Sequence, residues 1–147
     1  MVVLLIIAVL SCTQRKNPYL NNLGIDPTLM AEMDIPNYTE ITWMDTLVDL
    51  GAVRPGDTLH FSYRFRNTGS RPLFVINTRT TCGCTMGQFS KEPVWPNEES
   101  VIKARYAWSG DTGTFKKYIA VHTNTTNGNW HRLAFTGSVR VDSTKQQ

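Results

Sequence analysis

The sequence predicts an all-β sandwich, and two features of the chain carry this prediction. From about Thr39 onward, segments with an apolar residue at every second position alternate with short turns rich in Gly, Pro and Asn. Such alternation buries one face of a strand and leaves the other face in solvent. About seven segments of this kind follow one another at a spacing of about 8–15 residues. That pattern is typical of an immunoglobulin-like β-sandwich.

The segment Leu59–Phe65 ("LHFSYRF") has the clearest strand pattern, with apolar residues at every odd position. A turn precedes it at Arg54–Asp57 ("RPGD"), where Pro55 sets φ and Gly56 is free to adopt positive φ. The stretch Thr85–Glu98 lacks alternation, so we expect it to be irregular. The other expected strands are "EITWM", "TLVDLGAV", "LFVINTRTTC", "SVIKARYAW", "TFKKYIAVHT" and "NWHRLAFTGSVRV".

The first residues predict export rather than a part of the fold. Val2–Leu10 is continuously apolar. This run is shorter than the ~20 residues that cross a bilayer as a helix, and has the length of a signal-peptide core. A buried N-terminal strand or helix is the alternative, but the polar stretch that follows disfavours it. "VLSC" (Val9–Cys12) resembles the lipobox of bacterial lipoproteins, in which the signal is cut before a cysteine that then carries lipid.

This interpretation divides the 147 residues into four parts. Residues 1–11 are the expected signal peptide, and residues 12–38 hold the lipidated Cys12 and a tether rich in Asn and Pro. Residues 39–141 form the sandwich domain, and 142–147 are a C-terminal tail. The expected location is the bacterial cell envelope, where the lipid anchors the protein to a membrane and the domain faces the periplasm.

Four short motifs resemble a bacterial family, domain of unknown function 1573, over about Asp49–Val139. They are an F-x-F-x-N-T-G-like stretch that ends at Gly69, then P-L, then C-G-C-T, then P-x-E-x-S. The resemblance implies an immunoglobulin-like sandwich of the major-sperm-protein and hydin type, often carried on envelope lipoproteins, and it implies no established activity. Asn97 stands where the family usually has glycine, and Asn tolerates positive φ, so the turn should survive.

Nothing in the sequence predicts catalysis or a cofactor. Glu98 and Glu99 are adjacent in a turn, which is a poor way to hold two carboxylates across a substrate. There is no Gly-rich phosphate loop, nucleophile elbow or His-x-x-x-His pair. We therefore expect a protein that is not an enzyme. The formal net charge of +3 is too small by itself to argue for nucleic acid, and no nucleic-acid partner is expected.

A basic face is the first candidate binding surface. Arg64 and Arg66 have outward parity in one expected strand, and Lys103 and Arg105 have it in another. In an immunoglobulin-like topology these two strands are neighbours, so the four side chains should gather on one sheet surface. They either form an ordinary solvated face or bind an acidic polymer or protein of the envelope, with an affinity that falls as salt rises.

Three apolar residues in the expected irregular stretch form a second candidate: Met86, Phe89 and Trp95. End loops of such sandwiches often carry binding. The alternative, which we favour, is that Trp95 closes one end of the core.

Cys82 and Cys84, one glycine apart, are the third candidate. In an extended strand their Cα atoms would lie roughly 6.5 Å apart, near the upper limit for a disulfide, and a bend at Gly83 could close the gap. Two thiolates could instead hold a soft ion such as Cu(I). We rank packed structural thiols first, then a disulfide, then a soft-metal site, then a redox relay or an intermolecular bond.

Together these features predict an envelope lipoprotein whose single immunoglobulin-like domain acts as a binding or structural module. The alternative is a small redox or copper-handling protein that uses Cys82 and Cys84. The histidines are weak metal-ligand candidates, because His60 and His122 have outward parity and His131 lies at a strand start.

Overall fold

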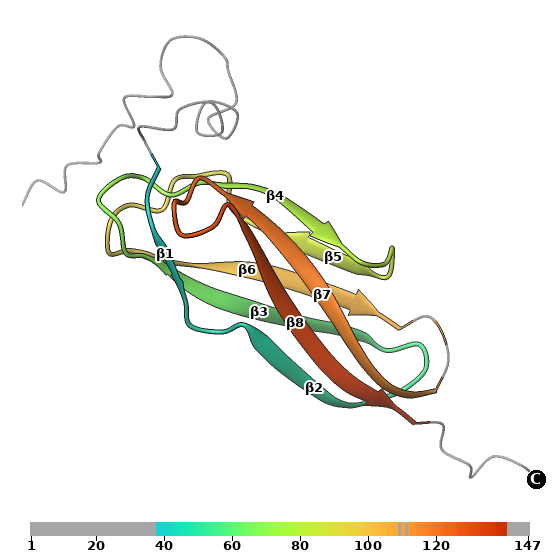
Figure 1. Cartoon of the computed structure of the whole chain (residues 1–147). Helices are drawn as coiled ribbons and strands as arrows, with labels where there is room; N and C mark the ends of the chain where they lie inside the picture. Colours follow the sequence, from blue (N-terminus) through green and yellow to red (C-terminus); the bar gives the residue numbers. More distant parts are fainter. Residues whose placement is uncertain (1–37, 109, 111, 141–147) are drawn as a thin grey trace, which may run out of the picture.

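The computed structural model describes residues 38–108, 110 and 112–140, and these form two four-stranded sheets packed face to face (Figure 1). One sheet has the strand order β1-β3-β6-β5 and the other the order β2-β8-β7-β4. The prediction of an all-β sandwich is confirmed, with eight strands where about seven were expected. The strands are β1 (Ile41–Trp43), β2 (Leu47–Val53), β3 (Thr58–Asn67), β4 (Val75–Thr80), β5 (Thr85–Gln88), β6 (Glu99–Ala107), β7 (Gly113–Thr123) and β8 (Trp130–Val139).

The two central pairs are long and antiparallel. In one sheet β3 pairs with β6 from Thr58↔Ala107 to Arg66↔Glu99, and in the other β7 pairs with β8 from Gly113↔Val139 to His122↔Trp130. The chain crosses from one sheet to the other between β1 and β2, and β2 then runs parallel to β8. At the opposite side the edge strands β4 and β5 lie next to each other, joined by the turn that holds the two cysteines (Figure 1).

The core forms from the alternation that the sequence shows. Tyr63 and Phe65 of β3, Tyr106 of β6 and Phe135 of β8 are all fully buried and belong to one core cluster. At the other end of β3, the inward-facing Leu59 and Phe61 are only half-buried. Most side chains of the opposite parity are exposed along β3 and β6, so this sheet has an apolar inner face and a largely polar outer face.

Two expectations for the stretch Thr85–Glu98 were wrong. Its first residues form β5, which pairs with the end of β6 from Thr85↔Tyr106 to Gln88↔Lys103. The core residue at its end is Val94, not Trp95. Val94 is 7% exposed and exchanges two backbone hydrogen bonds of 2.9 Å with Leu73, whereas the Trp95 side chain is half-buried.

The turn at Asn97 has the geometry that the sequence predicts. Asn97 has a φ of 67° and is the one non-glycine residue with positive φ in the described part of the chain. Because asparagine tolerates this conformation, the turn forms without glycine.

A buried amide ties three segments together at one end of the sandwich. Asn67 is fully buried, and its Nδ2 donates to the carbonyl oxygens of Arg71 and Val94, at 2.7 and 2.8 Å. Its Oδ1 accepts from Thr39 Oγ1 at 2.8 Å and from the Gly69 amide at 3.1 Å. Asn67 therefore joins the chain before β1, the turn after β3 and the segment before β6.

Candidate functional site

The structure brings the four predicted basic residues onto one face. Arg64 and Arg66 on β3, and Lys103 and Arg105 on β6, are all exposed on the outer surface of the same sheet. Two of the four are already neutralised, because Arg64 pairs with Asp45 at 2.8 Å and Arg66 pairs with Glu99.

The Arg64 pair is a bidentate one. Its Nε and Nη2 donate to the two carboxylate oxygens of Asp45 at 2.8 and 3.1 Å. Hydrogen bonds from Arg64 hold the pKa of Asp45 below its usual value, so this pair remains ionised in mildly acidic solution. A guanidinium engaged in this way has fewer donors left for a ligand.

The remaining cations of this face, Lys103 and Arg105, border a shallow hollow of about 340 Å³ that His60 and Ser62 also line. Neither cation lies within 4.0 Å of a carboxylate of the described residues. Arg105 instead donates to the Met86 sulfur at 3.1 Å.

The predicted apolar loop site does not form as one cluster. Met86 lies on the outer face of β5 with 48% of its surface exposed. Phe89, by contrast, packs against the core from the inner side, and Trp95 lies close to the Asn97 turn. The side chains of Met86 and Phe89 therefore point to opposite sides of the sheet.

The two cysteines are joined to each other. Cys82 and Cys84 form a disulfide with a Cα–Cα distance of 5.3 Å, in the turn between β4 and β5 rather than within an extended strand. The structure thus contains the second-ranked arrangement in place of packed free thiols. Gly83 does not adopt positive φ, so the turn closes without the conformational freedom of glycine.

This turn lies beside the end of β6 and the middle of β7. The Cys84 carbonyl accepts from the Ala107 amide at 2.9 Å, and the Thr81 amide donates to the Tyr118 carbonyl at 3.4 Å. Cys84 also packs against the core. The disulfide therefore fixes a short connection between the edges of the two sheets.

We expect the variant with Cys82→Ser and Cys84→Ser to stay folded. The ring is tiny, so a chain-entropy estimate gives about 1–2 kcal/mol of stabilisation, less than a long-loop bridge contributes. Denaturant unfolding should show this loss in the double variant. A thiol reductant should cause a similar loss in the wild type and none in the variant, whereas complete unfolding on reduction would contradict the prediction.

Among the described residues, no group of three or more His, Cys, Asp and Glu side chains lies together. His60 is exposed, as its parity predicts. His131 is half-buried beside Trp43, and its Nε2 lies 3.1 and 3.0 Å from the hydroxyls of Thr123 and Thr125. Burial lowers the pKa of His131, partly offset by a hydrogen bond with the Gly128 backbone, so the neutral imidazole is favoured there.

The outer face of the other sheet carries a cluster that the sequence analysis missed. Trp130, at the start of β8, is 41% exposed. The His122 ring stacks on it at 4.5 Å with an interplanar angle of 3°. The Arg79 guanidinium of β4 lies 4.8 Å from the indole centre.

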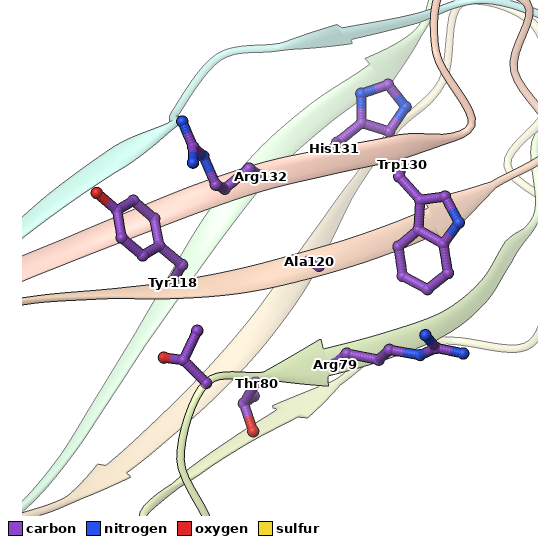
Figure 2. Close-up of a pocket in the computed structure, with 8 residues that line it drawn as sticks. Arg79, Thr80, Tyr118, Ala120, Trp130, His131 and Arg132 are labelled. Atoms are coloured by element: carbon purple, nitrogen blue, oxygen red, sulfur yellow. The ribbon is translucent and has the colours of Figure 1, made fainter.

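A second arginine repeats this arrangement nearby. Arg132 is the next outward-facing residue of β8 after Trp130. Its guanidinium is 4.9 Å from the centre of the Tyr118 ring of β7. Between the two arginine–aromatic pairs is a shallow pocket of about 310 Å³, with Ala120 at its floor (Figure 2). We call Arg79, Tyr118, Trp130 and Arg132 the aromatic–arginine face.

The electrostatics of the aromatic–arginine face differ from those of the predicted basic face. Asp49 is the only carboxylate in the four strands of this sheet. Within the described residues, neither Arg79 nor Arg132 has a carboxylate within 4.0 Å. A guanidinium that rests on an aromatic ring keeps its edge donors available and loses less freedom when it binds an anion. This face can therefore hold a carboxylate or phosphate with an attached ring or apolar group.

One signal in the sequence could have found this face. In "NWHRLAF", Trp130 and Arg132 have the parity opposite to Leu133 and Phe135, which marks them as outward. An exposed tryptophan next to an outward arginine is a common feature of binding surfaces. The contact of Arg79 with Trp130 runs diagonally across β7. It can be predicted only when the registers of β4, β7 and β8 are known.

The fold is that of an immunoglobulin-like β-sandwich domain. The family described as "Protein of unknown function (DUF1573)" matches residues 41–139, and the chain belongs to this family. A search of curated proteins finds no match.

The three solved structures described next support the fold alone, because each is distant in sequence. A Porphyromonas gingivalis W83 protein of unknown function aligns with a TM-score of 0.60 and 14% identity, over 71% of this chain and 49% of that one. The chain thus spans about half of that protein. The ASH/PapD-like domain of human CEP192 (PapD-like domain 7) aligns with a TM-score of 0.58 and 10% identity, over 74% of this chain and 90% of that domain. The secreted serine protease VesC from Vibrio cholerae aligns with a TM-score of 0.52 and 14% identity, over 69% of this chain and 23% of the protease.

The part of the chain that the structure describes contains no helix that could cross a membrane. Cys12, the predicted signal peptide and all of the predicted tether except Tyr38 lie outside the described residues. The predicted tail (142–147) lies outside them too.

Proposed function

We propose that this protein is a non-catalytic module of the bacterial cell envelope that binds an anionic polymer, or an acidic surface of an envelope protein, on its aromatic–arginine face. The observation that carries the proposal is the pair Arg79 and Arg132, each placed on an aromatic ring and neither paired with a carboxylate of the described residues. Membership of a family of unknown function and the distant fold relatives are compatible with a binding module.

The geometry suggests how such a ligand is held. Arg79 and Arg132 would each donate in-plane hydrogen bonds to a carboxylate or phosphate, and a fork of two donors suits both groups. Trp130 and Tyr118 would provide apolar contact beside the charge. The ligand needs several anionic groups, because one exposed contact adds little affinity.

Polymer binding tests the proposal, with poly-L-glutamate and polygalacturonate as probes. In the variant Arg79→Ala with Arg132→Ala, we expect affinity to fall by about ten-fold or more, since two charge-assisted contacts are lost. The matched control is Arg64→Ala with Arg66→Ala. It removes the same charge from arginines that are already paired, so the loss should be about three-fold or less.

Wild-type affinity should fall as salt rises, because the Debye length shrinks from about 10 Å at 0.1 M to about 3 Å at 1 M. Equal losses in the two double variants would mean that net charge alone drives binding. That result would contradict an assigned site on the aromatic–arginine face.

The envelope location depends on Cys12. In an export-competent bacterial host, the wild type should enter the detergent fraction and incorporate labelled lipid, and Cys12→Ala should lose the label. Cys82→Ala with Cys84→Ala is the control, because it removes cysteines without touching "VLSC". Equal labelling of the wild type and Cys12→Ala would rule out a lipid anchor at this residue.

A redox or copper-handling role for Cys82 and Cys84 remains the alternative. While the disulfide is closed, neither sulfur is a thiolate, which is the form that binds a soft ion. Such a role therefore requires reduction first. Stoichiometric copper in protein that was reduced and then exposed to the metal would favour this alternative over the binding module.

A further inference from the structure

The edge of β3 is only partly covered by another strand. β1 pairs with Phe65–Asn67, although β3 begins at Thr58. Next to this paired part, the amides of Met44 and Asp45 both donate to the Arg64 carbonyl. The chain then crosses to β2 in the other sheet. The first part of β3, Thr58–Tyr63, therefore pairs with β6 on one side and, within the described residues, has no paired strand on the other. We call this unpaired side the open edge of β3.

The peptide groups of His60 and Ser62 face this open edge. In an antiparallel strand, successive residues direct their backbone groups to alternate sides. The Asn67 amide bonds on the β6 side, to Glu98, whereas Arg64 bonds on the β1 side. His60 and Ser62 share the parity of Arg64, and within the described residues no backbone partner occupies their edge-facing groups.

An apolar strip lies just inside the edge. Leu59 and Phe61 of β3 point inward here and are half-buried, although they belong to the packed interior. On the facing sheet, Val48 and Leu50 of β2 are also half-buried against the core. The strip is half-exposed because β1 does not extend to this level.

The outer side of the same edge is basic. Ser62 is paired with Lys103 and His60 with Arg105, and these four residues line the hollow described above. Ser62 is small, so an acidic side chain next to it could reach across to Lys103. Neighbouring strands place such residues about 5 Å apart, so the added residue would lie about 10 Å from Lys103, a distance that a glutamate and a lysine side chain span together.

We propose that the open edge of β3 binds an extended segment of a partner polypeptide as an added strand, and that this segment alternates apolar with acidic residues. Its backbone would pair with His60 and Ser62, the main-chain contact of strand addition. Its apolar residues would cover Phe61 and Leu50, and its acidic residues would meet Lys103 and Arg105. A second copy of this chain fits less well, because pairing of two β3 edges would bring two basic faces side by side.

A labelled synthetic peptide in which valine and glutamate alternate tests this site by fluorescence anisotropy. One comparison peptide has the same composition in two blocks, and another alternates valine with lysine. The alternating valine–glutamate peptide should bind, and the block peptide and the lysine peptide should bind at least about ten-fold more weakly.

Two variants of the protein locate the contact. Ser62→Pro removes the edge-facing N–H but leaves the ladder to β6 intact, so binding should weaken about ten-fold. Ser62→Ala keeps that N–H and is the matched control. Lys103→Glu should weaken binding of the valine–glutamate peptide and strengthen binding of the valine–lysine peptide. This variant keeps the test decisive if Ser62→Pro does not fold. Arg79→Ala with Arg132→Ala should leave peptide binding unchanged, which separates this site from the aromatic–arginine face.

Equal binding of the alternating and block peptides would overturn the proposal, as would equal affinity of Ser62→Pro and Ser62→Ala. Self-association of the wild type that Ser62→Pro abolishes would also overturn it, since the occupant would then be a second copy.

Discussion

The change Asn67→Ala is expected to lower the free energy of unfolding by about 2–4 kcal/mol. The alanine removes two donor bonds to the carbonyls of Arg71 and Val94, and it removes the acceptor for Thr39 Oγ1 and the Gly69 amide. Asn67 is fully buried, so water cannot replace these partners without opening the end of the sandwich. Denaturant titration measures the loss.

Asn77→Ala is the matched control for this prediction. Asn77 is exposed on β4, and within the described residues its Oδ1 accepts one hydrogen bond, from the amide of the next residue, Thr78, at 2.7 Å. We expect its substitution to change stability by no more than about 0.5 kcal/mol. Similar losses in the two variants would contradict the role assigned to the buried amide.

Much of the fold could be predicted because alternation and turn chemistry are local properties. The inward parity of Tyr63 and Phe65 is visible in the sequence and agrees with their complete burial. Strand β5 could not be predicted in the same way. It is short, Gly87 interrupts its pattern, and it is held by pairing with β6, which is distant in sequence.

The candidate sites were harder to predict, because charge and exposure depend on neighbours from other strands. Parity placed Arg64 on the outer face, but its pairing with Asp45 depends on how the chain crosses between β1 and β2. The stacking of Arg79 on Trp130 depends in the same way on the registers of β4, β7 and β8. A sequence can therefore show that a side chain is outward before it shows whether that side chain is available.

The turn after β3 needs glycine for a steric reason. A Cβ on Gly69 would lie 2.2 Å from Thr39 Oγ1 and 2.5 Å from the backbone nitrogen of Glu40, far inside van der Waals contact. The approach is close because the Thr68 and Gly69 amides both donate to the Glu40 carbonyl, at 3.0 and 3.3 Å. Thr39 cannot move aside freely, since its hydroxyl is bonded to Asn67.

Gly69→Ala should therefore cost about 2–4 kcal/mol, from steric overlap together with loss of the Thr39–Asn67 bond. Gly83→Ala is the matched control, because a Cβ there has no atom within 4 Å and φ is not positive. We expect Gly83→Ala to change stability by no more than about 0.5 kcal/mol. Combining Gly69→Ala with Asn67→Ala should cost less than the sum of the two single changes, because both break the same contact between the turn and Thr39. Strict additivity in this double-mutant cycle would show that the clash and the amide network act independently.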